Sequence, residues 1–473
     1  MNLQKTKIVC TIGPSSDSLE IIEELIKSGM NVARINLSHG KEEDHLNIIS
    51  NIRNVSKKLD SPIPILADLP GPKYRLGEIK NNSLDLSTDD ELFLNCGNSN
   101  KDELSVWPPG LHLDVKNGAV LLVDDGAVEL EITEINKTII KTKVQLAGKI
   151  TSNKAVVPRG LPSKLDYFTE ETQSAINFVN SNDIDYLGLS YVRNVKDIIR
   201  VKEKIKDKNL KIISKIELQL ALDNLEEIIN HSDSIMVARG DLGVHLPISQ
   251  VPAAQKFIIN LCNQKGKEVI TATQMLESMT ENPQPTRAES TDVHNAVLDG
   301  SDAIMLSGET SIGKYPIRAV DFMREISTIA ENDINHKTLR GIKLDQVDSN
   351  NKKIIDELIA HGAANIADQL DAKLIVAFTE SGSTAARVAA YRPSQPVVAI
   401  SPDNNAAINL GLRWGVNTIN VESFDHIEDM FTFSENFVLE EKLASIGDTI
   451  VVVAGLPIGF KGNTNLIRVI TIN

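Results

Sequence analysis

Two short apolar runs end in ionisable residues whose types and spacing suit a cation and a phosphate. Ile212–Glu217 contains Lys215, and Ile235–Gly243 contains Asp241, as buried parallel strands do when their tips open into a site. Lys215 and Glu217 are two residues apart, so both side chains leave a strand on the same face. Two carboxylates and one ammonium at strand ends predict a divalent-cation site beside a phosphate or an enolate. A buried Lys–Glu ion pair that serves stability alone is the alternative.

A third run carries polar side chains on one face. In Val32–Ser38 the residues Arg34, Asn36 and Ser38 alternate with apolar ones, so all three point to one side of a strand. A solvent-exposed edge strand would show the same alternation. Predicted helices flank the run on both sides, which favours a strand inside a parallel sheet and a functional reason for its polar face.

Strands and helices alternate along most of the chain, and the polar residues lie at strand ends. Predicted strands fall at Thr6–Gly13, Val32–Ser38, Ile63–Pro70, Ile184–Val192, Leu210–Glu217, Asp233–Gly240, Glu268–Gln274 and Asp302–Glu309. Helices lie between them, and Ser18 and Thr169 are predicted N-caps of two of these helices. Eight strand–helix units predict an α/β fold, a (β/α)8 TIM barrel, with its active site at the C-terminal ends of the strands.

The alternation is interrupted between residues 71 and 160. Short β-rich runs separated by turn residues predict an inserted all-β domain there. Pro70–Pro72 and Pro158–Pro162 join it to the barrel, and such Pro/Gly-rich joints suit a hinged lid. The predicted domains are a catalytic barrel at 1–70 and 161–340, a β-barrel lid at 71–160, and a C-terminal α/β domain at 350–473.

Composition limits the partners and the compartment. The chain has 473 residues, too many for one core, and its net charge of −15 disfavours nucleic acid and anionic membranes as partners. No apolar run is long enough to span a membrane. The three cysteines, Cys10, Cys96 and Cys262, are far apart, which argues against a disulfide framework or a zinc motif and predicts a cytoplasmic protein.

Several longer strings resemble pyruvate kinases, nearly from end to end. The strings are Lys7–Pro14, Ala33–Gly40, Ser214–Glu217, Met236–Gly243, Ala272–Met279, Pro285–Glu289 and Met305–Thr310. The fourth and fifth are specific to that family. The resemblance implies transfer of the phosphoryl group of phosphoenolpyruvate to ADP, giving ATP and pyruvate through an enolate that a metal ion stabilises. It also implies a homotetramer.

By this resemblance, Glu217 and Asp241 would hold the divalent cation. Oxygen ligands suit Mg²⁺ or Mn²⁺ and argue against zinc. Lys215 would neutralise negative charge on the phosphoryl group during its transfer, which is the largest electrostatic demand of such a reaction. Arg34 would bind the same group.

The resemblance also assigns the groups around the rest of the substrate. Backbone N–H groups of Ala238, Arg239 and Gly240 would receive the substrate carboxylate. Thr273 would lie at the enolate face where a proton is delivered, although a strand threonine in a core is the alternative. Weaker candidates for support or a proton relay are Ser307 and Glu309 at the end of the eighth strand.

The nucleotide side carries a weaker pattern. Asn36, His39 and Arg75 match positions near ADP in the family, and Lys154 matches a lid lysine. The sequence Val156–Gly160 departs from the family's usual one, so a solvated surface lysine is an equally good interpretation of Lys154.

One departure concerns potassium. Members that depend on K⁺ carry Thr-Lys where this chain has Leu69-Pro70, and Glu where it has Lys73, so the chain resembles the K⁺-independent members. An ammonium at Lys73 can supply the fixed positive charge that K⁺ would bring to a site containing Asp68 and the substrate phosphate. We predict activity without added K⁺. The residues that match the potassium ligands of the family are Asn36, Ser38, Asp68 and Leu69.

In the third domain, small hydroxyl residues precede a predicted helix near Ala385. Thr379–Thr384 links a strand to that helix, and Gly455–Thr464 would be a facing glycine-rich loop. Such a helix N-terminus can cradle a phosphate, although an ordinary capped helix fits the spacing equally well. By resemblance the place binds a regulatory sugar phosphate or nucleotide. The candidate effector-binding residues are Thr379, Ser381, Gly382, Ser383 and Thr384.

Two other functions remain open from the sequence. One is a metal-dependent barrel that acts on phosphoenolpyruvate or pyruvate by enolate chemistry without a nucleotide. The other is a catalytically silent relative that only binds metabolites. His39 and Arg75 weigh against the first, and the presence of Lys215, Glu217 and Asp241 weighs against the second.

Overall fold

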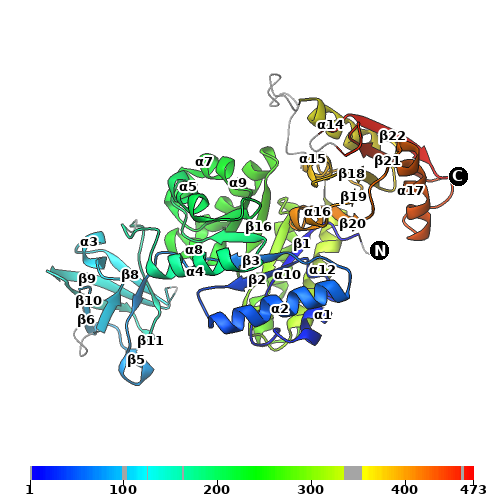
Figure 1. Cartoon of the computed structure of the whole chain (residues 1–473). Helices are drawn as coiled ribbons and strands as arrows, with labels where there is room; N and C mark the ends of the chain where they lie inside the picture. The colour runs from blue at the N-terminus through cyan, green and yellow to red at the C-terminus, as the bar shows by residue number, and fades with distance from the viewer. Residues whose placement is uncertain (1–2, 98–103, 125, 162–163, 335–353, 460–462) are drawn as a thin grey trace.

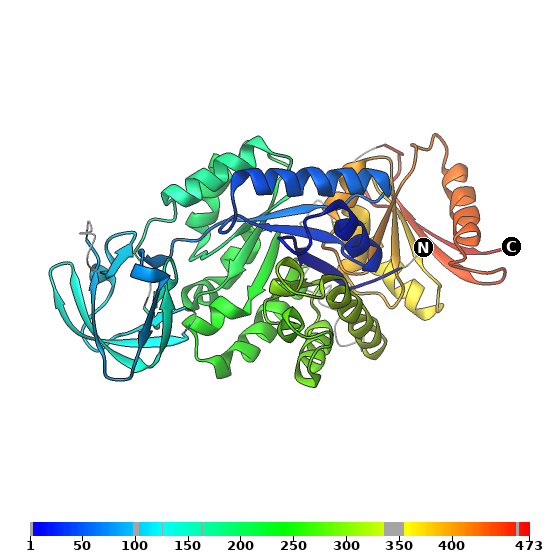
Figure 2. The same ribbon diagram turned by 90° about the horizontal axis from the view of Figure 1, so that it is seen from below.

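Three bodies lie in a row in the computed structural model (Figures 1 and 2): a β domain, a barrel and a C-terminal α/β domain. The structure describes residues 3–97, 104–124, 126–161, 164–334, 354–459 and 463–473. The polar stretch 335–353, and with it the predicted domain ends at 340 and 350, lies outside these residues.

Eight parallel strands close into the central barrel, in the order β1-β17-β16-β15-β14-β13-β3-β2. The strands are β1 Lys7–Thr11, β2 Val32–Asn36, β3 Ile65–Asp68, β13 Tyr186–Leu189, β14 Lys211–Ile216, β15 Ser234–Ala238, β16 Glu268–Ala272 and β17 Ala303–Leu306. Three precede the insertion and five follow it, so the predicted (β/α)8 barrel is confirmed. Each strand is shorter than its predicted run, because residues at one or both ends lie outside the ladder and belong to the adjoining loops.

Helices surround the barrel. They are α1 Leu19–Ser28, α2 Glu42–Lys58, α4 Glu170–Ser181, α5 Val195–Lys204, α6 Gln219–Asp223, α7 Leu225–His231, α8 Arg239–His245, α9 Val251–Gln264, α10 Arg287–Leu298, α11 Gly308–Ser311 and α12 Pro316–Asp333. The predicted caps are confirmed, since the side chains of Ser18 and Thr169 accept hydrogen bonds from Ile21 N and Thr172 N. Within the described part of the chain, no helix is long and apolar enough to cross a membrane.

The inserted residues form a second closed barrel, in the order β10-β6-β7-β4-β12-β8-β9, beside a two-stranded sheet β11-β5. Its strands are β4 Tyr74–Leu76, β5 Ser83–Leu86, β6 Glu91–Asn95, β7 Leu104–Trp107, β8 Val120–Val123, β9 Val128–Asn136, β10 Ile139–Leu146, β11 Gly148–Thr151 and β12 Ala155–Pro158. One short helix, α3 Leu111–Asp114, accompanies them. A separate apolar core, which includes Leu94, Leu130 and Ile140, shows that this domain has its own hydrophobic interior.

The C-terminal domain is a five-stranded sheet of order β20-β19-β18-β21-β22, with β22 antiparallel to β21. Its elements are α14 Ile354–Gln369, β18 Ile375–Phe378, α15 Ser383–Ala390, β19 Val397–Ser401, α16 Asn404–Asn409, β20 Val416–Asn420, α17 Ile427–Glu440, β21 Thr449–Ala454 and β22 Leu466–Thr471. The predicted α/β domain is therefore confirmed.

The C-terminal domain covers the end of the barrel where the strands begin. Leu412 is fully buried in the cluster of side chains that fills the barrel interior. Arg392 pairs with Asp302 at 3.1 Å, and Arg413 pairs with Glu268 at 3.0 Å, just before β17 and at the start of β16. The opposite end of the barrel, where the strands finish, is left to face the β domain (Figure 1).

The β domain meets the barrel at that opposite end. Leu122 and Val157 of the β domain pack against Val244 of α8. At the joint, a Cβ on Gly71 would lie 2.7 Å from the ring of Tyr191, closer than real Cβ atoms approach, so only glycine fits without displacement. The joint therefore runs directly beside a side chain at the end of β13.

Candidate active site

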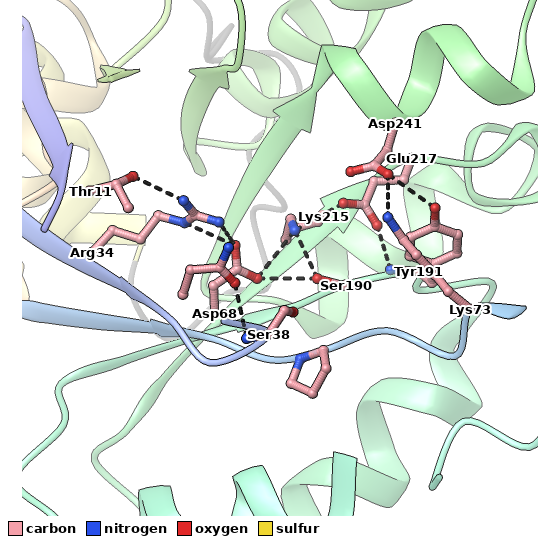
Figure 3. Close-up of polar contacts among 12 residues, drawn as sticks. Thr11, Arg34, Ser38, Asp68, Lys73, Ser190, Tyr191, Lys215, Glu217 and Asp241 are labelled. Atoms are coloured by element: carbon pink, nitrogen blue, oxygen red, sulfur yellow. Dashed lines mark hydrogen bonds and ion pairs between the residues drawn. The ribbon is translucent and has the colours of Figure 1, made fainter. Parts of the chain in front are cut away.

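Polar side chains from several strand ends converge on one place beneath the β domain (Figure 3). They are Thr11 from β1, Arg34 from β2, Asp68 from β3, Ser190 and Tyr191 after β13, Lys215 and Glu217 from the end of β14, Asp241 from α8, and Lys73 from the joint. The carboxyl ends of parallel strands share one edge of a barrel, which is why residues so distant in sequence meet.

Lys215 lies at the centre of this group. Its Nζ is 2.9 Å from Glu217 Oε1 and 3.2 Å from Asp68 Oδ1, and it donates to Ser190 Oγ at 2.8 Å. Burial acts to lower the pKa of Lys215, but the negative charges of Asp68 and Glu217 outweigh it and raise the pKa above its ordinary value. Lys215 is therefore a buried, charged ammonium, and its contact with Glu217 agrees with both side chains leaving the strand on the same face.

Arg34 and Asp68 form the second ion pair. Asp68 Oδ2 accepts from Arg34 Nε at 2.9 Å and from Nη2 at 2.6 Å, and Arg34 Nη1 donates to Thr11 Oγ1 at 2.9 Å. Burial acts to raise the pKa of Asp68, but the positive charges of Lys215 and Arg34 lower it below its ordinary value. Since Oδ1 also accepts from Ser190 Oγ at 3.1 Å, both carboxylate oxygens of Asp68 are engaged.

Lys73 pairs with Asp241. Lys73 Nζ donates to Asp241 Oδ1 at 2.6 Å, and Tyr191 Oη donates to the same oxygen at 3.0 Å. We predicted that Lys73 would bring its charge to the surroundings of Asp68, but in the structure its ion pair is with Asp241, because Arg34 and Lys215 already neutralise Asp68. Burial acts to raise the pKa of Asp241, while Lys73 and Lys215 together lower it well below its ordinary value.

Glu217 and Asp241 fit a divalent cation. Glu217 is fully buried, its Oε2 accepts from Tyr191 N at 2.6 Å, and its Oε1 makes no aligned hydrogen bond despite lying near Lys215. Among the described residues, no hydrogen bond or ion pair reaches Asp241 Oδ2. Nor do three or more His, Cys, Asp or Glu side chains gather there for a metal. The two carboxylates thus suit Mg²⁺ or Mn²⁺, which take further ligands from phosphates and water.

We expect the affinity for Mn²⁺ to fall as the pH is lowered through about 7. Burial and the negative charge of Asp241 raise the pKa of Glu217 to about 7, and only the carboxylate form binds a cation. Below that pKa a proton competes, so affinity should fall up to about tenfold per pH unit; above it, affinity should level off. Electron paramagnetic resonance of free Mn²⁺ between pH 6 and 8 measures this. Glu217→Gln should flatten the profile, and a flat wild-type profile would contradict the assignment.

Thr273 and the loop after β15 lie in contact in the structure. Thr273 Oγ1 accepts from Gly240 N at 2.8 Å, and Thr273 has φ +70°, a strained conformation for a β-branched residue. One N–H of the Ala238–Gly240 cluster is therefore engaged within the chain. The side chain of Arg239 turns away, to Asp292 at 2.7 Å and to Thr273 O. Strain held at the end of β16 is typical of a functional position.

Glu309 supports the loop that follows Thr273. This fully buried carboxylate accepts from Leu276 N at 3.0 Å and from Ser307 N at 2.7 Å. Within the described residues, Ser307 Oγ is buried without a hydrogen-bond partner. The two residues therefore hold the ends of β16 and β17 together, in line with a supporting role.

Three of the candidates for nucleotide binding, His39, Arg75 and Lys154, lie near one another. Burial and then the positive charges of Arg75 and Arg34 lower the pKa of His39 below its ordinary value, so these groups share one neighbourhood. Arg75 Nη1 donates to Asn153 O at 3.1 Å. Lys154 pairs with Asp124 at 2.8 Å and its side chain is 43% exposed, which also agrees with a solvated surface lysine.

The residues that match a potassium site are occupied by protein contacts. Asn36 Oδ1 accepts from Ser38 N at 3.1 Å, and Leu69 is buried with its N–H donated to Gly188 O at 2.9 Å. Asp68 has donors on both oxygens, as described above. The contacts of Asn36 and Asp68 engage side-chain oxygens, whereas the contact of Leu69 uses its N–H, and a cation would be bound by oxygen atoms.

In the C-terminal domain, the candidate effector residues form the start of α15. Thr379 Oγ1 accepts from Gly382 N at 3.0 Å, Gly382 has φ +89°, and the helix begins at Ser383, two residues before the predicted start. Thr384 and Thr464 share a hydrogen bond at 2.9 Å, so the predicted facing loop does lie opposite. A small cavity between them is lined by Thr379, Glu380, Ser383, Thr384, Gly455, Gly459 and Asn463 among others. Residues 460–462 of the loop lie outside the described chain.

Sequence reasoning missed Ser190 and Tyr191. Both lie at the end of the predicted strand Ile184–Val192, whose last three residues are Ser-Tyr-Val. Their position was a usable signal, because hydroxyl groups at the C-terminal end of a barrel strand point to the active site just as charged groups do at the other strand ends.

Both large parts of the chain match known family models. A model described as pyruvate kinase, barrel domain, matches residues 3–320, and one described as pyruvate kinase, alpha/beta domain, matches residues 357–470. The pyruvate kinase of Clostridium acetobutylicum is 39% identical over 473 residues, or 99% of each chain. Those of Bacillus licheniformis and Staphylococcus aureus are 41% and 39% identical over 99% of this chain and 80% of their own.

Proposed function

The chain belongs to the pyruvate kinase family and is a phosphotransferase of that type, and from this premise we propose how it works: it transfers the phosphoryl group of phosphoenolpyruvate to ADP, giving ATP and pyruvate in the last step of glycolysis. The observation that carries the proposal is Lys215, a buried ammonium between Asp68 and Glu217 at the strand ends. Phosphoryl transfer needs little covalent help and much fixed positive charge, which this arrangement supplies.

Charge balance in the site supports an anionic substrate with a metal ion. Lys73, Arg34 and Lys215 oppose Asp68, Glu217 and Asp241, three positive groups against three negative ones. A divalent cation held by Glu217 and Asp241 would supply Lewis-acid stabilisation of the negative charge that develops on substrate oxygens. Arg34 and Lys215 would then orient the phosphoryl group between the substrate and ADP.

Protonation of the enolate would take place at the Thr273 side of the site. The Thr273 hydroxyl is held by Gly240 N and by Ala272 O, which fixes its position at the strand end. Glu309 and Ser307 lie behind the same loop. Thr273 would orient the proton donor, and the substrate carboxylate would be held by the N–H groups of the 238–240 loop other than that of Gly240, which Thr273 already engages.

ADP would bind where the β domain overhangs the barrel. His39 and Arg75 share a positive neighbourhood there, which suits nucleotide phosphates, and Asn36 lies on the adjoining strand end. Lys154, now paired with Asp124, would join them when the β domain moves as a lid. The proposed division is a barrel at 1–70 and 161–340, a lid at 71–160 and a regulatory domain at 350–473.

The test is pyruvate formation from phosphoenolpyruvate and ADP with Mg²⁺, in buffers with and without K⁺. We expect turnover in both buffers, because Lys73 beside Asp241 supplies the fixed positive charge that K⁺ would otherwise bring. A manyfold rise in rate on replacing Na⁺ with K⁺ would contradict K⁺ independence while leaving the kinase assignment intact. No turnover in either buffer would favour a silent relative that only binds metabolites.

Regulation, assembly and location are further parts of the proposal. The hydroxyl-rich start of α15 faces the 455–464 loop, which supports binding of a sugar phosphate or nucleotide effector; an activation screen with such compounds tests it.

A homotetramer is proposed from family membership, and sedimentation equilibrium tests it. All three cysteines are free and buried, which supports a cytoplasmic location that cell fractionation can check.

A further inference from the structure

Tyr191 contacts both carboxylates that would hold the metal ion. Its backbone N–H donates to Glu217 Oε2 at 2.6 Å, and its Oη donates to Asp241 Oδ1 at 3.0 Å (Figure 3). Glu217 follows β14 and Asp241 lies in α8, so they come from different elements. One residue at the end of β13 thus ties together two carboxylates whose spacing decides whether they can share a cation.

Tyr191 is itself held rigidly. Its ring packs against Gly71, where a Cβ would lie 2.7 Å away, and meets the ring of His245 edge-on at 5.6 Å. Lys73 Nζ lies 4.6 Å from the centre of the ring, in cation–π geometry. Tyr191 is 6% exposed and has φ +57°, an uncommon conformation for a bulky residue. Strain of this kind persists only where the surroundings impose it.

The two hydrogen bonds leave particular oxygens for a cation. Lys73 and Tyr191 occupy Asp241 Oδ1, and in the described chain no hydrogen bond or ion pair reaches Oδ2. Tyr191 N occupies Glu217 Oε2, whereas Oε1 has no aligned hydrogen bond. Tyr191 therefore holds one oxygen of each carboxylate. Asp241 Oδ2 remains for a ligand, and Glu217 Oε1 faces Lys215 Nζ at 2.9 Å.

We propose that Tyr191 is a positioning residue of the metal site, which sets the orientation of Asp241 through its hydroxyl and that of Glu217 through its backbone N–H. The inference rests on the proposed function, since it assumes that these carboxylates bind a divalent cation. Partners that orient metal ligands commonly contribute 10-fold to 100-fold to affinity, so the hydroxyl of Tyr191 is expected to contribute on the order of 10-fold.

Tyr191→Phe tests this by removing only the hydroxyl. The ring that contacts Gly71, His245 and Lys73 remains, so the variant should fold. We expect the dissociation constant for Mn²⁺, measured by electron paramagnetic resonance without substrates, to rise about 10-fold. The Mg²⁺ concentration for half-maximal activity should rise in parallel, while kcat at saturating Mg²⁺ changes much less, because added metal restores the occupied site.

Tyr186→Phe is the matched control. Tyr186 begins the same strand, is equally buried, and donates its hydroxyl to Ile408 O at 2.6 Å at the other end of the barrel. It should lower stability without changing Mn²⁺ affinity. Unchanged Mn²⁺ affinity in Tyr191→Phe, or an equal change in Tyr186→Phe, would overturn the proposal. It would also be overturned if the wild-type chain bound no Mn²⁺, or if Asp241→Asn left its Mn²⁺ binding unchanged. Absence of turnover in a wild type that binds Mn²⁺ would instead count against the proposed function alone.

Discussion

Lys215→Met should lower the rate of pyruvate formation by at least about 1,000-fold, the scale on which a charge-stabilising group contributes to phosphoryl transfer. Lys215 Nζ lies within 3.2 Å of both Asp68 and Glu217 and is buried, so its charge acts in a medium of low dielectric constant. Methionine has a similar length and no charge. The measurement is steady-state pyruvate formation at saturating phosphoenolpyruvate, ADP and Mg²⁺.

The same substitution should also reduce stability, so a control is needed. Removing one partner of a buried ion pair leaves an uncompensated charge and costs about 3–5 kcal/mol. Lys7→Met is the matched control: Lys7 is also buried, but its Nζ donates to Val416 O at 2.6 Å at the opposite end of the barrel. We expect Lys7→Met to lower the urea concentration at the midpoint of unfolding. At urea concentrations below that midpoint its turnover should equal that of the wild type. A folded Lys215→Met protein with turnover within tenfold of wild type would refute the role of Lys215.

The barrel could be predicted from sequence because its strands are continuous apolar runs between helices with recognisable caps. Ser18 caps α1 as the pattern indicated. Strand ends were predicted too long, as in 302–309, where the residues from Ser307 onward leave β17 and enter α11. The short strands of the β domain, such as β4 Tyr74–Leu76 and β12 Ala155–Pro158, escaped prediction because three or four residues are too few to show a period.

Residues of the site could be predicted where chemistry and strand position coincide, but not which partner each would take. Lys215 and Glu217 could be placed on one face, since residues two apart in a strand point the same way, and in the structure they are in contact. The partner of Lys73 depends on how the β domain leaves the barrel, which no local pattern encodes. Tyr191 carries a signal in the sequence, a hydroxyl at a strand end, but its partners Glu217 and Asp241 are supplied only by the folded chain.

Lys73→Glu should make the enzyme dependent on a monovalent cation. The substitution replaces an ammonium 2.6 Å from Asp241 by a second carboxylate, so the charge beside the metal site changes by two units. Without K⁺ we expect turnover to fall by about 100-fold, the scale of losing one electrostatic contact to the reacting group. Because neighbouring carboxylates attract a cation, saturating K⁺ should raise the turnover of Lys73→Glu by at least about tenfold. Initial rates across a series of K⁺ concentrations at constant ionic strength measure both effects.

Lys73→Met separates loss of the positive charge from gain of a negative one. It removes the ammonium but adds no carboxylate to attract K⁺, so its rate should fall and K⁺ should recover less of it than in Lys73→Glu. Mg²⁺ is kept saturating so that altered metal affinity at Asp241 does not imitate an effect of K⁺. If Lys73→Glu and wild type respond to K⁺ alike, the charge of Lys73 does not substitute for a monovalent cation, and its ion pair with Asp241 serves structure alone.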